Sequence, residues 1–216
     1  MNNMTNGINS ETVKEYGLNA GAHVVGIAAS KDFSLAPEGK KPSDALKGCL
    51  SVVVLGTPFP QEALLKTSVE YTEIRNGMYK KMDGIAKEVT KQIKGKGYKA
   101  IEIVGLGSKI SLKHAAELAG LGIISRNYLL TNPEYGNLLW FSAVLTDADL
   151  IPDKKASYTI CNSCNKCAEM CPSKALDNPA LFGRKACSGT CFKMENRKWE
   201  ISCFLCRKVC PYCFGN

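Results

Sequence analysis

The sequence predicts an α+β protein in which an α/β domain is followed by a small cysteine-rich domain. Ten of the 11 cysteines lie between Cys161 and Cys213. The first ~150 residues instead alternate short apolar runs with amphipathic stretches, the pattern of strands and helices packed in layers. No apolar stretch approaches the roughly 18 residues that a membrane helix needs. We therefore expect one domain over residues 1–152 and a second over residues 153–216.

Hydrophobic periodicity places three helical stretches and four strands in the first domain. The helices are expected at 10–19, capped by Ser10, at 61–94, with a break near 76–77, and at 111–119, ending at Gly120. The long stretch carries an apolar face at steps of three and four, made by Met78, Met82, Ile85, Val89 and Ile93. The strands are expected at 23–29, 50–55, 100–104 and 138–146.

Two cysteine runs carry the chemistry. The first, C-x2-C-x2-C-x3-C-P, is made by Cys161, Cys164, Cys167, Cys171 and Pro172, and a partial second run is made by Cys203, Cys206, Cys210 and Pro211. The first run has the bacterial ferredoxin spacing, in which the fourth cysteine binds the other of two [4Fe–4S] clusters. One cluster would take Cys161, Cys164, Cys167 and Cys210, and the other Cys171, Cys203, Cys206 and one more. The spacing leaves Cys187 and Cys191 open for that place, and it predicts a protein that moves single electrons.

Zinc and disulfides are the alternatives for these cysteines. Zinc sites usually combine two separated C-x2-C pairs, whereas three cysteines lie here within seven residues. Disulfides need an oxidising compartment, and the polar N-terminus lacks the apolar core of a signal peptide, so we expect a cytoplasmic protein. Cys213 and the spare member of the pair Cys187 and Cys191 are expected as free thiols near the clusters. Cys49 is expected as an inert core residue.

The formal net charge of +8 overstates the basic character of a cluster-loaded protein. Eight ligating thiolates subtract 8 and two cluster cores of formal +2 add 4, which leaves about +4. The densest basic stretch, residues 87–99, is typical of the solvated end of a helix. It would also suit an acidic electron donor or an RNA, and the sequence does not choose between them.

Residues 111–136 form the most unusual segment outside the cysteines. Gly120 and Gly122 permit a positive φ or a close backbone approach, and a turn with Ser125, Arg126 and Asn127 follows. The segment is either a ligand-binding loop or a tight connection that binds nothing.

This segment and the cysteine runs together resemble the epoxyqueuosine reductase and reductive dehalogenase group of iron–sulfur proteins. The shared pattern is A-x-x-A-G-L-G-x-x-G-[KR]-N-x-L-L-x-x-P-x-Y-G, then L-T-D, then the two runs, over residues 111–211. Ser125 stands where the pattern has glycine, and Cys213 has no counterpart in it. The resemblance implies a nitroreductase-like α/β domain joined to a ferredoxin-like double-cluster domain. It also implies a corrinoid (cobalamin) between the domains, close enough to one cluster to be reduced by it.

The resemblance assigns particular residues. In the group, the cysteine before the second run follows a basic pair, as Cys187 follows Arg184 and Lys185, so Cys187 is favoured as the eighth ligand. The residues implied at the wall facing the cofactor are Gly122, Ser125, Arg126 and Asn127.

The function implied is a redox protein that passes low-potential electrons through two clusters to a corrinoid, as a reductase or by reducing a partner's corrinoid. A ferredoxin or flavodoxin would supply the electrons. The alternatives are a plain electron-transfer protein and a flavin-dependent reductase that binds FMN. Epoxyqueuosine reduction on tRNA is not expected, because the group's acidic proton donor would fall near Leu106 and no Asp or Glu lies between Glu102 and Glu117. We therefore expect neither a nucleic-acid partner nor a membrane.

Overall fold

The computed structural model describes residues 7–105, 108–178, 183–195 and 198–215. The chain forms two compact units. The sheet unit comprises Met1–Thr57, Tyr79–Leu121 and Trp140–Ala156, and the cysteine unit comprises Pro58–Met78, Gly122–Leu139 and Ser157–Asn216. The chain thus passes between the units five times, whereas we expected one boundary after residue 152. Leu106, the position expected for an acidic residue in the resemblance, lies outside the described residues.

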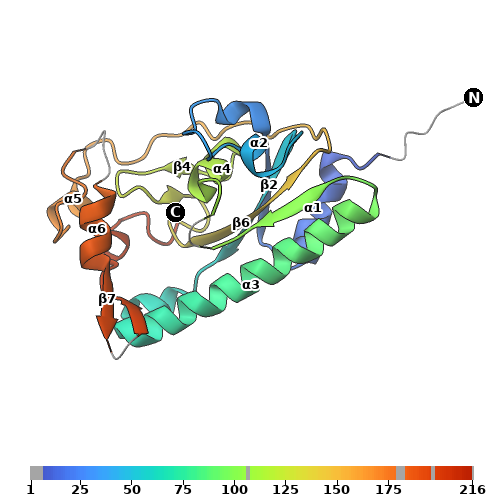
Figure 1. The fold of residues 1–216 in the computed structure, drawn as a ribbon. Helices are drawn as coiled ribbons and strands as arrows, with labels where there is room; N and C mark the ends of the chain where they lie inside the picture. The colour runs from blue at the N-terminus through green and yellow to red at the C-terminus, as the bar shows by residue number, and fades with distance from the viewer. Residues whose placement is uncertain (1–6, 106–107, 179–182, 196–197, 216) are drawn as a thin grey trace, which may run out of the picture. The chain divides into compact units, whose positions relative to one another are not determined.

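A four-stranded sheet in the order β1-β2-β6-β3 forms the centre of the sheet unit (Figure 1). Its strands are β1 (Val24–Ala29), β2 (Ser51–Pro58), β6 (Leu139–Thr146) and β3 (Ala100–Ile103). β1 pairs antiparallel with β2, and β3 pairs antiparallel with β6. Residues 52–55 are all fully buried, which explains why this strand is a continuous apolar run rather than an alternating one. All four predicted strands are confirmed.

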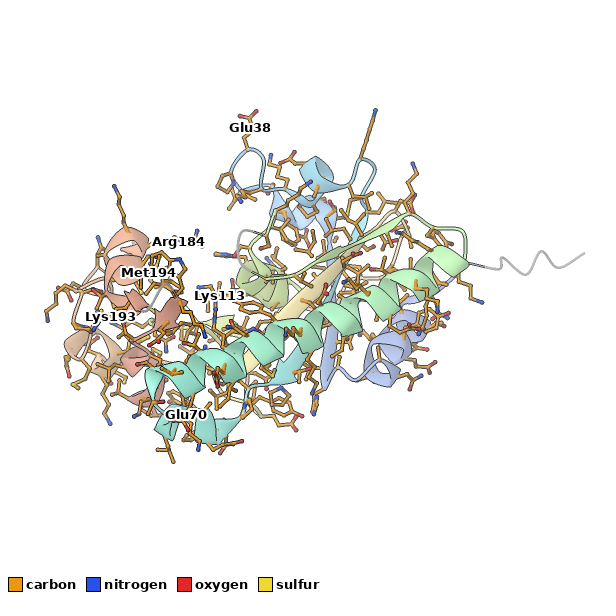
Figure 2. The ribbon with its side chains drawn as sticks, turned by 60° about the horizontal axis from the view of Figure 1, so that its bottom comes forward. Glu38, Glu70, Lys113, Arg184, Lys193 and Met194 are labelled. Carbon is orange, nitrogen blue, oxygen red and sulfur yellow. The ribbon has the colours of Figure 1, made fainter. Side chains whose placement is uncertain are left out.

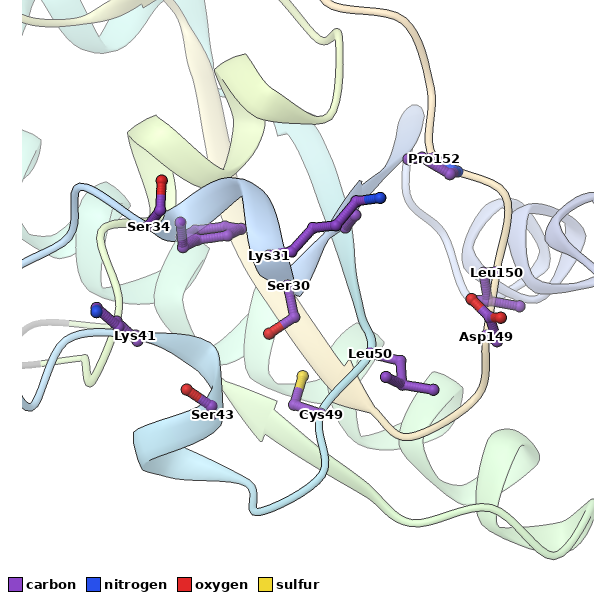
Figure 3. A pocket seen from close by; sticks show the side chains of 12 residues that line it. Ser30, Lys31, Ser34, Lys41, Ser43, Cys49, Leu50, Asp149, Leu150 and Pro152 are labelled. Carbon is purple, nitrogen blue, oxygen red and sulfur yellow. The ribbon is translucent and has the colours of Figure 1, made fainter.

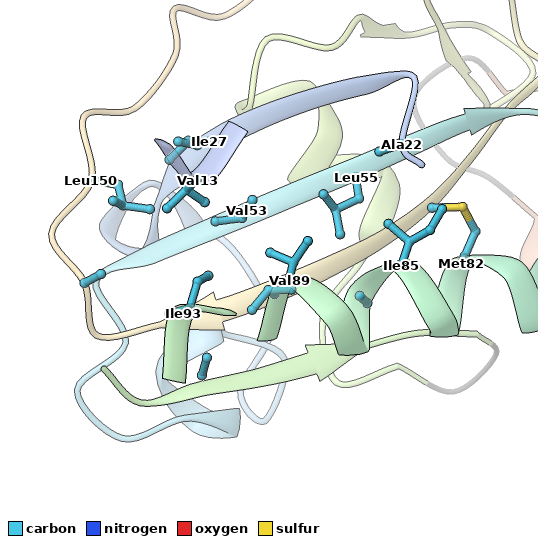
Figure 4. Close-up of a cluster of buried hydrophobic side chains, with 14 residues drawn as sticks. Val13, Ala22, Ile27, Val53, Leu55, Met82, Ile85, Val89, Ile93 and Leu150 are labelled. Atoms are coloured by element: carbon cyan, nitrogen blue, oxygen red, sulfur yellow. The ribbon is translucent and has the colours of Figure 1, made fainter. Parts of the chain in front are cut away.

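Helices cover both faces of this sheet. The helices that contribute to the sheet unit are α1 (Ser10–Asn19), η1 (Ser30–Phe33), α2 (Pro42–Ala45), α3 (Ser68–Gly95) and α4 (Leu112–Leu118). On one face, α1 and α3 pack on β1 and β2 to make the core shown in Figure 4, with Met82, Ile85 and Val89 of α3 directed at the sheet. On the other face, a Cβ at Gly26 of β1 would overlap the carbonyl oxygen of Ala119 after α4. Gly26 is therefore required by the close approach of α4.

The predicted helices differ from the observed ones in two details. The α1 cap is Asn9, whose side chain accepts a hydrogen bond of 2.8 Å from the Thr12 amide, while the Ser10 hydroxyl instead donates to the Ile151 carbonyl. The long helical stretch is divided at 66–67 rather than at 76–77, into the 3-10 turn η2 (Gln61–Leu65) and a continuous α3. A single glycine inside a well-packed helix costs only about 1 kcal/mol, so Gly77 does not interrupt α3.

The cysteine unit is built from short elements, and of these the periodicity predicted only η2, as the start of the long helical stretch. They are η2, β4 (Ile123–Ile124), β5 (Leu130–Thr131), α5 (Lys166–Glu169), α6 (Arg184–Cys191), β7 (Phe192–Glu195), β8 (Lys198–Ile201) and α7 (Leu205–Lys208). The antiparallel β7–β8 hairpin pairs Met194 with Trp199, both more than half exposed. Lys193 and Met194 lie on β7, which follows directly after α6, the helix that begins at Arg184 (Figure 2).

Within the described residues, no helix has both the length and the apolar character needed to cross a membrane.

The β2 core is expected to dominate the stability of the sheet unit. Leu55 is fully buried, whereas Leu35 is 97% exposed. We expect Leu55→Ala to lower the free energy of unfolding by about 2–5 kcal/mol, and Leu35→Ala to change it by less than about 0.5 kcal/mol. Urea unfolding of both variants measures the difference, and equal losses would contradict this core.

Candidate metal centres

The four cysteines predicted for the first cluster line one small cavity of the cysteine unit. Its walls are formed by Ser125, Asn127, Cys161, Cys164, Cys167, Cys210, Pro211 and Tyr212. The first three of these cysteines lie in the loop before α5 and in α5 itself, and Cys210 lies in the turn after α7. α5 and α7 contact each other, so helix packing unites two runs that lie about 40 residues apart. The short loop that carries the first three cysteines does not itself place a fourth thiol in this cavity. The fourth thiol, Cys210, comes from the second run.

Cys171, Cys187 and Cys203, which were predicted for the second cluster, lie near Cys206 of α7. Burial is the main cause that raises the pKa of the Cys206 thiol to about 12, while Arg207 opposes this rise and the nearby thiols of Cys187 and Cys203 contribute to it. Cys187 packs against the buried cluster that contains Cys167 and Cys171 and that Cys206 also contacts. These contacts bring Cys171 of the first run to the thiols of the second run, as an exchange of ligands between the runs requires.

Cys191 also lies beside the second run. The Cys191 thiol donates a hydrogen bond of 3.1 Å to the Cys203 carbonyl oxygen. Burial raises its pKa to about 11, and the nearby thiols of Cys187 and Cys203 contribute to this rise. The structure therefore places both Cys187 and Cys191 near the second run, and the eighth ligand stays a prediction.

The surroundings of Cys171 favour the thiolate form of its side chain. Burial raises its pKa, but hydrogen bonds from the Ser173 hydroxyl and from the backbone N–H groups of Ala175, Ser173 and Leu176 outweigh burial and lower it overall. Such donors stabilise a negatively charged sulfur.

No group of three or more His, Cys, Asp or Glu side chains converges closely enough to hold a single metal ion, among the residues that the structure describes.

The residues predicted for the cofactor wall lie around the β4–β5 hairpin, beside the first cavity. The Ser125 hydroxyl bonds to the Thr131 hydroxyl. The Asn127 amide donates to the Cys206 carbonyl oxygen (3.1 Å), and its oxygen accepts from the Leu129 amide (3.1 Å). Ser125 therefore ties the hairpin to itself, and Asn127 fastens the hairpin to the second cysteine run.

Gly122 and Arg126, the other two predicted wall residues, differ from this pair. A Cβ at Gly122 would overlap the carbonyl oxygen of Thr131, so the hairpin itself requires a glycine there. The Nε atom of Arg126 is buried and makes no hydrogen bond within the described residues. Its positive charge lies close enough to Cys167 to lower the pKa of that thiol, against the larger raising effect of burial. Arg126 is thus the one wall residue with a buried donor left for a ligand.

Sequence reasoning missed the residues that anchor the second run. Tyr71 of α3 stacks on Phe204 with ring centroids 4.1 Å apart, and the Thr72 hydroxyl accepts a 2.8 Å hydrogen bond from the Ile201 amide. From the sequence we expected these α3 residues in the first domain. Since they lie about 130 residues from their partners, no local pattern could have revealed the contacts.

The sheet unit has a larger pocket of a different kind (Figure 3). Lys31 and Lys41 extend to opposite sides of it, so their charges do not converge on one ligand. Cys49 lies at its centre, where burial raises the pKa of the thiol and the sulfur donates to the Ser51 carbonyl oxygen at 3.4 Å. Cys49 is buried, as predicted for an inert core residue.

Comparisons with known proteins identify relatives of this chain. No family model matches it. It is 27% identical over 201 residues to the epoxyqueuosine reductase of Lactococcus garvieae, covering 81% of this chain and 55% of that protein. It is 32% identical over 136 residues to the tetrachloroethene reductive dehalogenase of Sulfurospirillum multivorans, covering 56% of this chain and 26% of that protein. The chain thus spans little more than half the length of the first of these relatives and about a quarter of the second.

Solved structures share the mixed α/β fold. An epoxyqueuosine reductase bound to a modified tRNA stem loop has a TM-score of 0.67 at 18% identity and covers 94% of this chain and 64% of its own. A reductive dehalogenase whose structure suggested a mechanism for B12-dependent dehalogenation has a TM-score of 0.69 at 23% identity, over 95% of this chain and 32% of its own. The resemblance stated from the sequence motifs is confirmed.

One expectation from the sequence is wrong. We expected no nucleic-acid partner, but the relatives include epoxyqueuosine reductases, and one of them was solved with a tRNA stem loop. The missing acidic residue near Leu106 was too narrow a basis for excluding RNA, because it concerned one proton donor and not the surface that binds a partner.

Iron content distinguishes Cys187 from Cys191. We expect Cys187→Ala to lose one cluster, about half of the iron of an eight-iron protein, and Cys191→Ala to keep nearly all of it. Iron and acid-labile sulfide are measured on anaerobically purified variants. Iron loss in Cys191→Ala alone would reverse the assignment.

The cluster-free protein should lose stability as pH rises. Burial lifts the pKa of Cys206 to about 12 and that of Cys191 to about 11, from an ordinary 9.0. The folded state therefore holds these protons more tightly, and the stabilisation is complete below pH 9.0 and is lost as pH rises through the folded-state values. Urea unfolding of the cluster-free chain from about pH 7 to about pH 11 should show this decline, and Cys206→Ala should make it shallower. A stability that is constant or increases with pH would contradict the burial of these thiols.

Proposed function

Since the chain is related in sequence and fold to the epoxyqueuosine reductases and reductive dehalogenases, we propose that it is an iron–sulfur reductase that passes electrons through two [4Fe–4S] clusters to a corrinoid. The observation that carries this proposal is the cavity in which Cys210 of the second run joins Cys161, Cys164 and Cys167 of the first. This exchange is the ligand pattern of a two-cluster ferredoxin. On this proposal the cysteine unit is ferredoxin-like and the sheet unit is nitroreductase-like.

The first cluster would be held by Cys161, Cys164, Cys167 and Cys210, and the second by Cys171, Cys187, Cys203 and Cys206. The buried donors near these sulfurs fit negatively charged clusters. Cys171 receives one hydroxyl and three backbone N–H groups, and Arg126 places a positive charge beside Cys167. When loaded, the clusters supply one-electron transfer, and the protein sets their potential through charge, burial and hydrogen bonds to sulfur.

The corrinoid is supported by the relationship to a B12-dependent dehalogenase and by Arg126. The side chains of Ser125 and Asn127 make hydrogen bonds within the cysteine unit. The buried Arg126 Nε makes none among the described residues, so its N–H can donate to an acceptor atom of a ligand. Gly122 keeps the hairpin backbone compact beside it. A corrinoid bound there would supply a strong nucleophile and one-electron reductant, while the protein provides position and electrostatics.

Epoxyqueuosine reduction on tRNA is the second candidate, because it is the reaction named for most of the relatives. It uses the same two clusters, so it differs from the first candidate only in the final acceptor.

The corrinoid test uses anaerobically purified protein mixed with hydroxocobalamin and then desalted. We expect about eight irons per chain and a retained corrinoid spectrum. Arg126→Ala should keep its iron and lose most of the corrinoid, while Lys31→Ala in the sheet unit is a matched control that should lose neither. Eight irons without retained corrinoid would favour a plain electron carrier or an FMN-dependent reductase, which added FMN distinguishes.

The tRNA test incubates reduced protein with epoxyqueuosine-modified tRNA and follows the nucleosides by mass spectrometry. Conversion to queuosine that disappears in Cys210→Ala would establish the second candidate. Retained corrinoid without conversion would direct the search toward small-molecule substrates.

A further inference from the structure

Asn137 carries a buried donor that the fold does not use. The residue is 1% exposed, and its Nδ2 atom makes no hydrogen bond within the described residues. A buried amide N–H without an acceptor destabilises the folded state. Buried polar groups without a hydrogen-bond partner are rare in folded proteins, so the surroundings of this donor indicate what it binds.

Every other polar group of Asn137 is fixed. Its backbone amide donates to the Cys213 carbonyl oxygen (3.1 Å), and its own carbonyl oxygen accepts from the Arg207 guanidinium. The side-chain oxygen accepts from the Cys213 thiol, whose sulfur lies 3.7 Å away. The thiol therefore determines which way the amide is turned, because an acceptor held by Cys213 leaves the NH2 group directed elsewhere.

The backbone around this contact leaves no room for adjustment. Gly136 has φ +57°, and a Cβ there would overlap the Cys213 carbonyl oxygen; Gly215 has φ +88°, and a Cβ there would overlap the Glu134 carbonyl oxygen. Residues 133–137 thus pack directly on residues 213–215, and two glycines make this close approach possible. Asn137 is held against Cys213 by the fold and not by a flexible side chain.

Cys210, a predicted ligand of the first cluster, also lies beside this amide. The Cys213 amide donates to the Cys210 carbonyl oxygen at 3.0 Å, so the two residues form one turn. The Asn137 side chain also lies close enough to the Cys210 thiol to lower its pKa, although burial, the larger effect, raises it.

We propose that the Asn137 NH2 group donates a hydrogen bond to the Cys210 sulfur when that sulfur ligates the first cluster, and that the Cys213 thiol orients the amide for this purpose. The inference rests on the proposed function, which makes Cys210 a ligand. Reduction adds one electron and hence negative charge to the cluster and its sulfurs, so a donor to sulfur stabilises the reduced form and raises the potential. Asn137 sets the potential of the first cluster relative to the second, and Cys213 is a positioning residue rather than a ligand.

The test is an anaerobic redox titration followed by electron paramagnetic resonance, which reads the midpoint potentials of both clusters. Asn137→Leu keeps the size of the side chain and removes the donor. We expect the potential of one cluster to become more negative while that of the other stays unchanged, with the iron content retained. Cys49→Ala, which removes a buried thiol of the sheet unit, is the control and should move neither potential.

Variants of Cys213 test the orienting role and serve if Asn137→Leu does not fold. Cys213→Ala should shift the same cluster in the same direction, and Cys213→Ser, whose hydroxyl can still donate to the amide oxygen, should restore most of the potential. Loss of iron in Cys213→Ala would show that Cys213 is a ligand and overturn the inference. Unchanged potentials in both Asn137→Leu and Cys213→Ala would also overturn it. If the unaltered protein holds no clusters, the proposed function itself fails, so the two failures are distinguishable.

Discussion

The close approach of the two cysteine runs is the constraint on which the cysteine unit depends. Three thiols at i, i+3 and i+6 surround one side of a cluster, and the fourth must come from another part of the chain. The contact between α5 and α7 brings the two cysteine runs together, because Cys167 lies on α5 and Cys210 follows α7. The stacking of Phe204 on Tyr71 and the hydrogen bond from Ile201 to Thr72 fix the second run from the side of α3.

These anchors explain why the two units are interleaved along the chain. The cysteine unit takes residues 58–78 and 122–139 from the first part of the sequence. The first of these segments provides the aromatic and hydroxyl anchors, and the second provides the hairpin and turn that carry Asn127 and Asn137. The cysteine unit therefore uses supports that a ferredoxin-like segment of 153–216 alone would lack. Separating the chain at residue 152 would remove them.

The strands and the long helix of the sheet unit could be predicted because they depend on local apolar patterns. Residues 52–55 are buried on both faces, and the α3 positions from Met78 to Ile93 form one buried stripe. The cap of α1 was misplaced by one residue, because both Asn9 and Ser10 are good capping residues and only the contact with Ile151 decides between them. The short elements of the cysteine unit have too few residues for a period to be recognised.

The site residues that could be predicted are the cysteines, because their spacing in the sequence indicates their chemistry. The residues that depend on contacts between distant segments could not be predicted. The four cysteines of the first cavity were identified from the sequence, as was the segment that holds Ser125 and Asn127. Asn137 and Arg207 carried no signal, since an asparagine after a Tyr-Gly turn and an arginine between two cysteines are ordinary surface residues in a sequence. Their role depends on the packing of 133–137 against the C-terminal turn. Cys213 has no counterpart in the motif of the related group, and its contact with Asn137 suggests a structural reason for its presence.

Mössbauer spectroscopy of protein loaded anaerobically with isotopically enriched iron tests the central claim most directly. The account predicts about eight irons per chain in two cubane clusters, and it predicts that Cys210→Ala disrupts one of them while leaving the other intact. A spectrum of isolated iron or of a [2Fe–2S] centre would contradict the account. So would a Cys210→Ala variant that retains both clusters unchanged.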